Sequence, residues 1–150
     1  MVPRRLSYEL HKLTARLDRV ADGLLREAAG VSYARFLALF AVRECRGTQR
    51  DMARWLGLSE PSASRMVRIL ADDGVLEVKT LVGQGNRRLV QLTAEGDELI
   101  DRCGELLEAR FEAFVKLCGV DYRSYQEQTR RLLGKLEAAP AANLPPLEME

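Results

Sequence analysis

The feature that most restricts the fold of this chain lies in the stretch RDMARWLGLSEPSASRMVRILADDG, residues 50–74. Thr48 precedes an aspartate by three residues, a spacing typical of the capping box that begins a helix. Gly57 supplies a tight turn, and Ser59 with Pro61 begins a second helix, because serine caps helices and proline fits the first helical turn. The sequence therefore predicts two helices joined by a short turn.

The second of these helices, expected over residues 59–73, is amphipathic. One face is apolar and consists of Ala63, Met66, Val67 and Leu70. The opposite face and its flanks carry hydroxyl and guanidinium groups, which belong to Ser62, Ser64, Arg65 and Arg68. This arrangement is typical of a helix–turn–helix, although an ordinary helix pair with a solvated arginine face has the same pattern.

Two short runs rich in β-branched and apolar residues follow, at 75–81 and 87–92. The GQG at 83–85 suits a turn between them, and it lacks the following helix and the lysine of a phosphate-binding loop. A β-hairpin is therefore favoured over a nucleotide site, and Arg87 and Arg88 begin its second strand. A helix–turn–helix followed by such a hairpin is a winged helix–turn–helix.

Further helices are expected on both sides of this lobe. The first helix carries a heptad seam, typical of a helix that meets another, made of Leu6, Leu10, Leu13, Leu17, Val20 and Leu24. Gly30 ends it, and Ser32 caps the next. Thr93 begins a long helix with an apolar stripe of Ile100, Cys103, Leu107, Phe111, Phe114 and Cys118. The apolar side chains of the last helix are expected to face inward, and they belong to Tyr122, Tyr125, Leu132, Leu133 and Leu136.

These elements predict a mainly α fold with a small β-hairpin wing, in a single domain over residues 1–150. Within it, residues 32–92 form the winged helix–turn–helix lobe. Residues 1–30 and 93–139 form a helical dimerisation region, because the leucine seam exceeds what one small domain needs and is expected to face a second subunit. Residues 140–150 form a proline-broken tail.

Composition excludes several classes of protein. No apolar run approaches the roughly 20 residues of a membrane span, and the start of the chain lacks the apolar core of a secretory signal, so we expect a cytoplasmic protein without membrane contact. The sole histidine, His11, has no cluster of metal or catalytic partners near it in sequence, so no enzyme, metal or cofactor is expected. Residues 46–92 carry eight Lys and Arg against five Asp and Glu, which favours an anionic partner for that segment.

Three widely spaced cysteines favour reduced thiols over disulfides or a zinc site. Cys103 and Cys118 lie on the apolar stripe and are expected to act as small buried side chains. Cys45 lies beside Arg43 and Arg46, which could lower the pKa of its thiol, although we expect it to be a bystander.

The run TQRDMARWLGLSEPSASRMVRILADDGVLE, the hairpin and the LT-x-x-G at residues 92–96 resemble the MarR family of winged-helix transcription regulators, over nearly the whole chain. The resemblance implies a homodimer in which the first and last two helices interlock and which binds a pseudo-palindromic DNA duplex. Many members release DNA when a small phenolic or anionic effector enters a cleft beside the lobes. We therefore expect a sequence-specific DNA-binding regulator, a repressor.

The resemblance places the recognition helix 59–73 in the major groove and the hairpin wing 75–92 beside it. The residues expected to contact DNA are Ser62, Ser64, Arg65, Arg68, Arg87 and Arg88. Arginine suits guanine bidentately, and the serines suit phosphate. The family's usual Asp-x-Arg at the wing tip is replaced by Gln84 and Asn86. We therefore predict Arg87 as the main wing contact, in the minor groove, with Arg88 as a weaker backup.

The resemblance also implies an effector cleft, and the eligible residues are Arg16, Arg19, Tyr33, Phe36, Phe40, Arg43 and Trp55. Aromatic rings with arginines would suit a small aromatic carboxylate, although core aromatics beside surface arginines have the same pattern. The atypical wing tip and the net charge of only +1 leave an alternative function open. The chain could be a winged-helix protein-interaction module, or a regulator that has lost operator binding.

Overall fold

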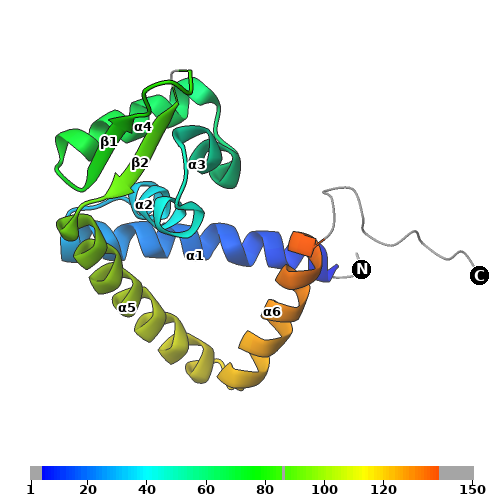
Figure 1. The fold of residues 1–150 in the computed structure, drawn as a ribbon. Coiled ribbons are helices and arrows are strands. Elements are labelled where there is room, and N and C mark those ends of the chain that lie inside the picture. Colours follow the sequence, from blue (N-terminus) through cyan, green and yellow to red (C-terminus); the bar gives the residue numbers. More distant parts are fainter. Residues whose placement is uncertain (1–4, 86, 139–150) are drawn as a thin grey trace, which may run out of the picture. The chain divides into compact units, whose positions relative to one another are not determined.

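The computed structural model describes residues 5–85 and 87–138. Its described part contains α1 (Leu6–Ala29), α2 (Tyr33–Cys45), α3 (Gln49–Leu56), α4 (Glu60–Asp72), β1 (Leu76–Thr80), β2 (Arg88–Leu92), α5 (Ala94–Leu117) and α6 (Tyr122–Ala138) (Figure 1). The predicted mainly α fold with a small hairpin is confirmed. No described helix is both long and apolar enough to cross a membrane. Two predicted features, the wing-tip residue Asn86 and the tail 140–150, lie outside the described residues.

The chain divides into two compact units, Met1–Leu107 and Glu108–Glu150, with the division inside α5. The first unit holds α1, the whole winged lobe and the first part of α5. The second holds the rest of α5 and α6. The predicted limits of the lobe and of a dimerisation region stay predictions.

Local signals in the sequence begin and end the helices as expected. Ser32 caps α2 by accepting a hydrogen bond from the Arg35 N–H. Thr48 and Asp51 form a reciprocal capping box at the start of α3. Gly57 ends α3 at a φ of 66°, a left-handed conformation that glycine adopts without steric cost. Each of these three predictions is confirmed.

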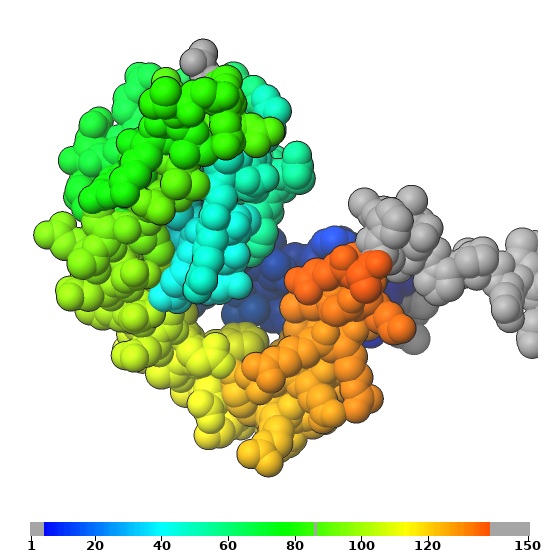
Figure 2. All heavy atoms as spheres, in the orientation of Figure 1, coloured from blue at the N-terminus to red at the C-terminus, as the bar shows by residue number. Residues whose placement is uncertain are grey.

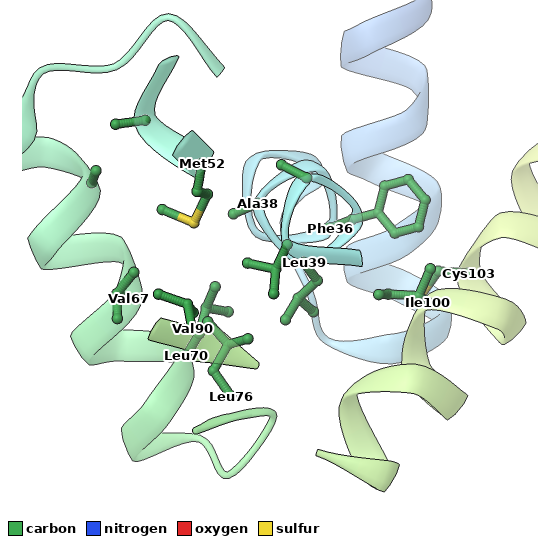
Figure 3. Close-up of a cluster of buried hydrophobic side chains, with 14 of the residues drawn as sticks. Phe36, Ala38, Leu39, Met52, Val67, Leu70, Leu76, Val90, Ile100 and Cys103 are labelled. Carbon is green, nitrogen blue, oxygen red and sulfur yellow. The ribbon is translucent and has the colours of Figure 1, made fainter. Parts of the chain in front are cut away.

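The core of the first unit surrounds α2, which supplies a continuous buried face containing Phe36, Ala38 and Leu39. In Figure 3 the side chains of α4 and the hairpin approach α2 from one side, and those of α5 from the other. The largest fully buried side chains of the described chain are Leu25, Leu39, Met52, Leu70, Ile100, Val90 and Cys103. This packing holds the helix–turn–helix and the hairpin together as one lobe.

The LT-x-x-G sequence joins the hairpin to α5. The Thr93 hydroxyl donates to the Gly74 carbonyl at 2.8 Å and accepts from the Gly96 N–H at 3.1 Å, which caps the helix. A Cβ atom at Gly96 would collide with the backbone carbonyl oxygen of Val75. Glycine is therefore required here by the close approach of two backbones, not by a turn.

The second unit is held by aromatic contacts. Phe111 of α5 lies 6.5 Å from the Tyr122 ring and 6.4 Å from the Tyr125 ring, measured between centroids. Three leucines of α6 that were expected to face inward are instead 63%, 51% and 59% exposed, namely Leu132, Leu133 and Leu136. That prediction is wrong for these three leucines, because no described part of the second unit covers this face of α6.

Candidate nucleic-acid interface

The helix–turn–helix is formed by the packing of α4 on α3. Ala63 and Val67 of α4 are buried, as are Met52 and Ala53 of α3. The Leu58 N–H donates to the Ala53 carbonyl at 2.9 Å, which closes the turn between the helices. The predicted apolar face of the recognition helix is therefore the face that packs.

The opposite face of α4 is open to solvent, and it carries the predicted DNA-contacting side chains. Ser62, Arg65 and Arg68 are exposed, and Ser64 is half-buried. Within the described part of the chain, neither Arg65 nor Arg68 forms an ion pair. Both guanidiniums therefore keep all their donors for an external partner, and such donors match the acceptor pair of guanine or a phosphate.

Ser62 has a second role at the start of this helix. Its N–H donates to the Ser59 side-chain oxygen at 3.3 Å, and its own oxygen accepts a hydrogen bond from the Ser59 hydroxyl at 2.9 Å. The Ser62 hydroxyl therefore still has its proton to donate. Donors at a helix N-terminus are well placed for an anion.

The wing is an antiparallel hairpin whose second strand is attached to the segment just before α3. Thr80 of β1 pairs with Arg88 of β2. The Val90 N–H donates to the Gly47 carbonyl at 3.3 Å, and Thr48 bridges to Leu89 in antiparallel fashion. Figure 2 shows the atoms of the hairpin, in green, adjoining those of α3. The wing is thus fixed beside the start of α3 by backbone hydrogen bonds.

A polar groove of about 830 Å³ lies between the wing, α3 and the start of α4. Its charged lining consists of Arg50, Arg54, Arg87 and Arg88 with Asp51 and Glu60. Arg50 Nε lies 3.2 Å from Glu60 Oε1, and Arg54 Nη1 lies 3.9 Å from Asp51 Oδ1. The excess of arginine makes the groove attractive to an anion.

Asp51 is held in its charged form at the edge of this groove. The hydrogen bonds it accepts from the Thr48 N–H at 2.9 Å and hydroxyl at 2.8 Å lower its pKa most. The charges of Arg54 and Arg87 lower the pKa further. Arg87 therefore lies close enough to the start of α3 for its charge to act there.

Sequence reasoning missed the α3 contribution to this surface. Gln49, Arg50 and Arg54 line the groove beside the wing. The capping-box signal correctly began α3, but only the pairing of β2 with the chain before α3 brings these side chains to the wing. Sequence spacing alone contains no signal for that pairing.

The predicted effector residues are only partly brought together. Four aromatic rings form a ladder with centroids 6.1–6.2 Å apart, in the order Tyr33, Phe36, Phe40 and Trp55. The Arg43 guanidinium lies 5.7 Å from the Phe40 ring centroid, and its Nη1 lies 2.6 Å from Asp101 Oδ1 of α5. Phe36 is buried in the core, which makes it a packing residue. The other two candidates, Arg16 and Arg19, are exposed on α1.

The cysteines fit the interpretation as bystanders, with one correction. Cys103 is buried as predicted, whereas Cys118 is exposed. The apolar stripe of α5 extends beyond the part of the helix that packs on the core. Burial raises the pKa of the Cys45 thiol, and the charge of Asp51 raises it further. The lowering considered from the neighbouring arginines is not observed. Among the described residues, no group of His, Cys, Asp and Glu could hold a metal ion.

No protein-family model and no curated protein matches the sequence. Solved structures match closely in shape. MarR from E. coli has a TM-score of 0.72 at 20% identity, covering 89% of this chain and 97% of that chain. The S. aureus MepR–DNA complex has a TM-score of 0.66 at 19% identity, covering 89% and 96%. A Mycobacterium tuberculosis MarR family protein in complex with salicylic acid has a TM-score of 0.68 at 22% identity, covering 90% and 98%. The fold of this chain is thus the winged-helix fold of these MarR-type regulators.

Proposed function

We propose that this protein is a sequence-specific DNA-binding transcription regulator. The observation that carries the proposal is the position of Arg65 and Arg68 on the open face of α4, without ion pairs in the described part of the chain. The opposite face of the same helix is fixed in the core, so the two guanidiniums are presented on a rigid element. The MepR–DNA complex among the similar structures supports DNA as the partner.

The protein acts as a homodimer that represses transcription. The exposed leucines of α6 support this part of the proposal, because contiguous exposed apolar surface on a soluble protein marks an interaction site. The N-terminal half of α1 also exposes Leu6 and Leu10 of its heptad seam. A second copy of the chain would cover such faces symmetrically.

A small aromatic or anionic effector releases the DNA. The ladder that ends at Trp55, with Arg43 against the Phe40 ring, supports a site for an aromatic carboxylate. The salicylic acid complex among the similar structures supports the same ligand class. The arginine would bind the carboxylate and the rings would pack on the aromatic ring.

The test is selection of bound duplexes from a random pool, followed by anisotropy titrations at fixed salt. We expect an inverted repeat whose half-site centres are one duplex turn, roughly 34 Å, apart. Arg65→Ala should lower the preference for the selected base at one position by about 1–3 kcal/mol. Arg102→Ala, which removes an exposed arginine of α5, is the matched control and should bind like the wild type.

Two outcomes would contradict the proposal. A wild-type affinity for the selected duplex equal to that for random duplex at the same salt would mean that the chain does not read sequence. A selected site that Arg65→Ala and Arg68→Ala bind as well as the wild type would mean that α4 is not the reader. The first result would favour the protein-interaction module or a regulator that has lost operator binding.

A further inference from the structure

The position of Arg87 bears on what the wing does on DNA. The carbonyl of Arg87 accepts a hydrogen bond from the Leu81 N–H at 3.0 Å, which continues the hairpin ladder one step beyond the Thr80–Arg88 pair. Two residues further on, Leu89 bridges to Thr48. Arg87 thus belongs to the hydrogen-bonded body of the hairpin, close to the part that is attached to α3.

Arg87 is one of the residues that line the groove between the wing, α3 and the start of α4. It lines that groove together with Arg88 of the wing and Arg54 of α3. Its charge reaches Asp51, whose carboxylate is anchored to the start of α3 by the Thr48 N–H. An arginine that reads the minor groove has to project from the wing, away from the helix–turn–helix. Arg87 instead lies on the wall of the groove that the wing shares with α3.

We infer that Arg87 and Arg54 together bind a phosphate of the DNA backbone in the groove between the wing and α3, so that the wing holds one strand instead of reading the minor groove. This inference rests on the proposed function. It replaces the minor-groove contact expected for Arg87 from the sequence.

The charges of the groove fit a phosphate. Four arginines and two carboxylates line it, an excess of two positive charges. Glu60 is paired with Arg50, and Asp51 lies nearest to Arg54, so the two wing arginines keep their donors. Within the described part of the chain neither wing arginine forms an ion pair. Guanidinium groups bind phosphate oxygens bidentately, with short charge-assisted hydrogen bonds.

In the described part of the chain, the side-chain amide of Gln49 lacks a hydrogen bond that a buried polar group ordinarily forms. Its Oε1 atom is buried and has no hydrogen-bond partner among the described residues, and the residue lines the groove. Buried side-chain polar atoms are ordinarily paired.

The test compares two chemical changes in the selected duplex, each with wild type, Arg87→Ala and Lys79→Ala. Methylphosphonate substitution removes the charge of one phosphate at a time. Exchange of adenine for 2,6-diaminopurine adds an amino group in the minor groove and leaves the major groove unchanged. Lys79→Ala is the matched control, because it removes an exposed cation of the wing that does not line the groove.

We expect one or two methylphosphonate positions per half-site to weaken the wild type and Lys79→Ala but not Arg87→Ala. Arg87→Ala should also lower the salt slope of binding by about one. Diaminopurine should affect all three proteins alike. The inference is overturned if Arg87→Ala keeps full sensitivity to every methylphosphonate, or if it alone loses sensitivity to diaminopurine. A wild type without sequence-specific binding would instead refute the proposed function, and with it this inference.

Discussion

The carboxylate of Asp22 accepts a hydrogen bond of 2.9 Å from the backbone N–H of Tyr33. A residue of α1 therefore satisfies the first N–H of α2, the helix at the centre of the core. The same carboxylate lies 2.7 Å from Arg26 Nε. The hydrogen bond from Arg26 lowers the pKa of Asp22 most, and the one from the Tyr33 N–H lowers it further.

The interactions of Asp22 predict how the stability of the folded chain depends on pH. Because the pKa of Asp22 is lower in the folded than in the unfolded chain, its contribution is fully present above the ordinary pKa of 3.8 and is lost as the pH falls through the folded value. Asp22→Asn should lower the Tm near neutral pH, and the difference from wild type should shrink at pH values well below 3.8. Thermal unfolding followed by circular dichroism across pH checks this. A difference in Tm that does not change with pH would contradict the charge-based account.

Replacement of the glycine at the hairpin–α5 junction should be costly. Gly96→Ala forces the hairpin backbone at Val75 away from α5, so we expect a loss of about 1–3 kcal/mol in the free energy of unfolding. Gly104→Ala, on the same helix but with nothing within 4 Å of the added Cβ, should instead be stabilising by up to about 1 kcal/mol. Urea denaturation distinguishes the two. Equal effects would mean that helix propensity alone decides both sites.

The exposed apolar face of α6 predicts a concentration-dependent assembly. Leu132→Glu places a charge on a side chain that is 63% exposed in the single chain, so the fold should be retained while a dimer is weakened at least about tenfold. Sedimentation velocity at several concentrations measures this. Arg130→Glu adds the same acidic group on an exposed polar position of α6 and should have the smaller effect. If both variants sediment like the wild type, α6 is not the interface.

The aromatic ladder predicts a fluorescence response to an aromatic carboxylate. Trp55 is the only tryptophan of the chain, and its ring centroid lies 6.1 Å from that of Phe40. Titration with salicylate should change its emission, and Arg43→Ala should weaken the apparent affinity by about tenfold, the loss of one charge-assisted hydrogen bond. Benzyl alcohol, which lacks the carboxylate, is the matched control ligand. An identical response of Arg43→Ala and wild type would remove Arg43 from the site.

The parts of the fold that sequence reasoning predicted correctly depend on local chemistry. The capping box at Thr48, the turn at Gly57 and the amphipathic α4 each involve residues within a few positions of one another. The backbone there has few alternatives, so a short pattern is enough to identify the structure. The helix boundaries and the apolar face of the recognition helix were therefore predictable.

The features that sequence reasoning missed depend on contacts between distant segments. The helical periodicity of the apolar residues predicted that Leu133 would be buried, but it is exposed in the single chain. Periodicity does not show whether the surface that would cover an apolar face belongs to the same chain. The arginines beside Cys45 could have lowered the pKa of its thiol, but burial and the charge of Asp51 raise that pKa. The groove that Arg54 shares with Arg87 exists only because β2 pairs with the chain before α3.

The attachment of β2 to the segment before α3 also divides the wing into two zones that differ in their tolerance of sequence change. In the middle of β2, the Val90 N–H donates to the Gly47 carbonyl, and the Val90 side chain is buried in the core. A substitution there disturbs α3 and its capping box along with the strand. At the tip, a Cβ atom on Gly83 would meet no atom of the described residues within 4 Å, although its positive φ of 87° is one that other residues rarely adopt. Insertions at the tip would thus leave α3 and α4 in place, so the length of the tip can vary without disturbing the helix–turn–helix.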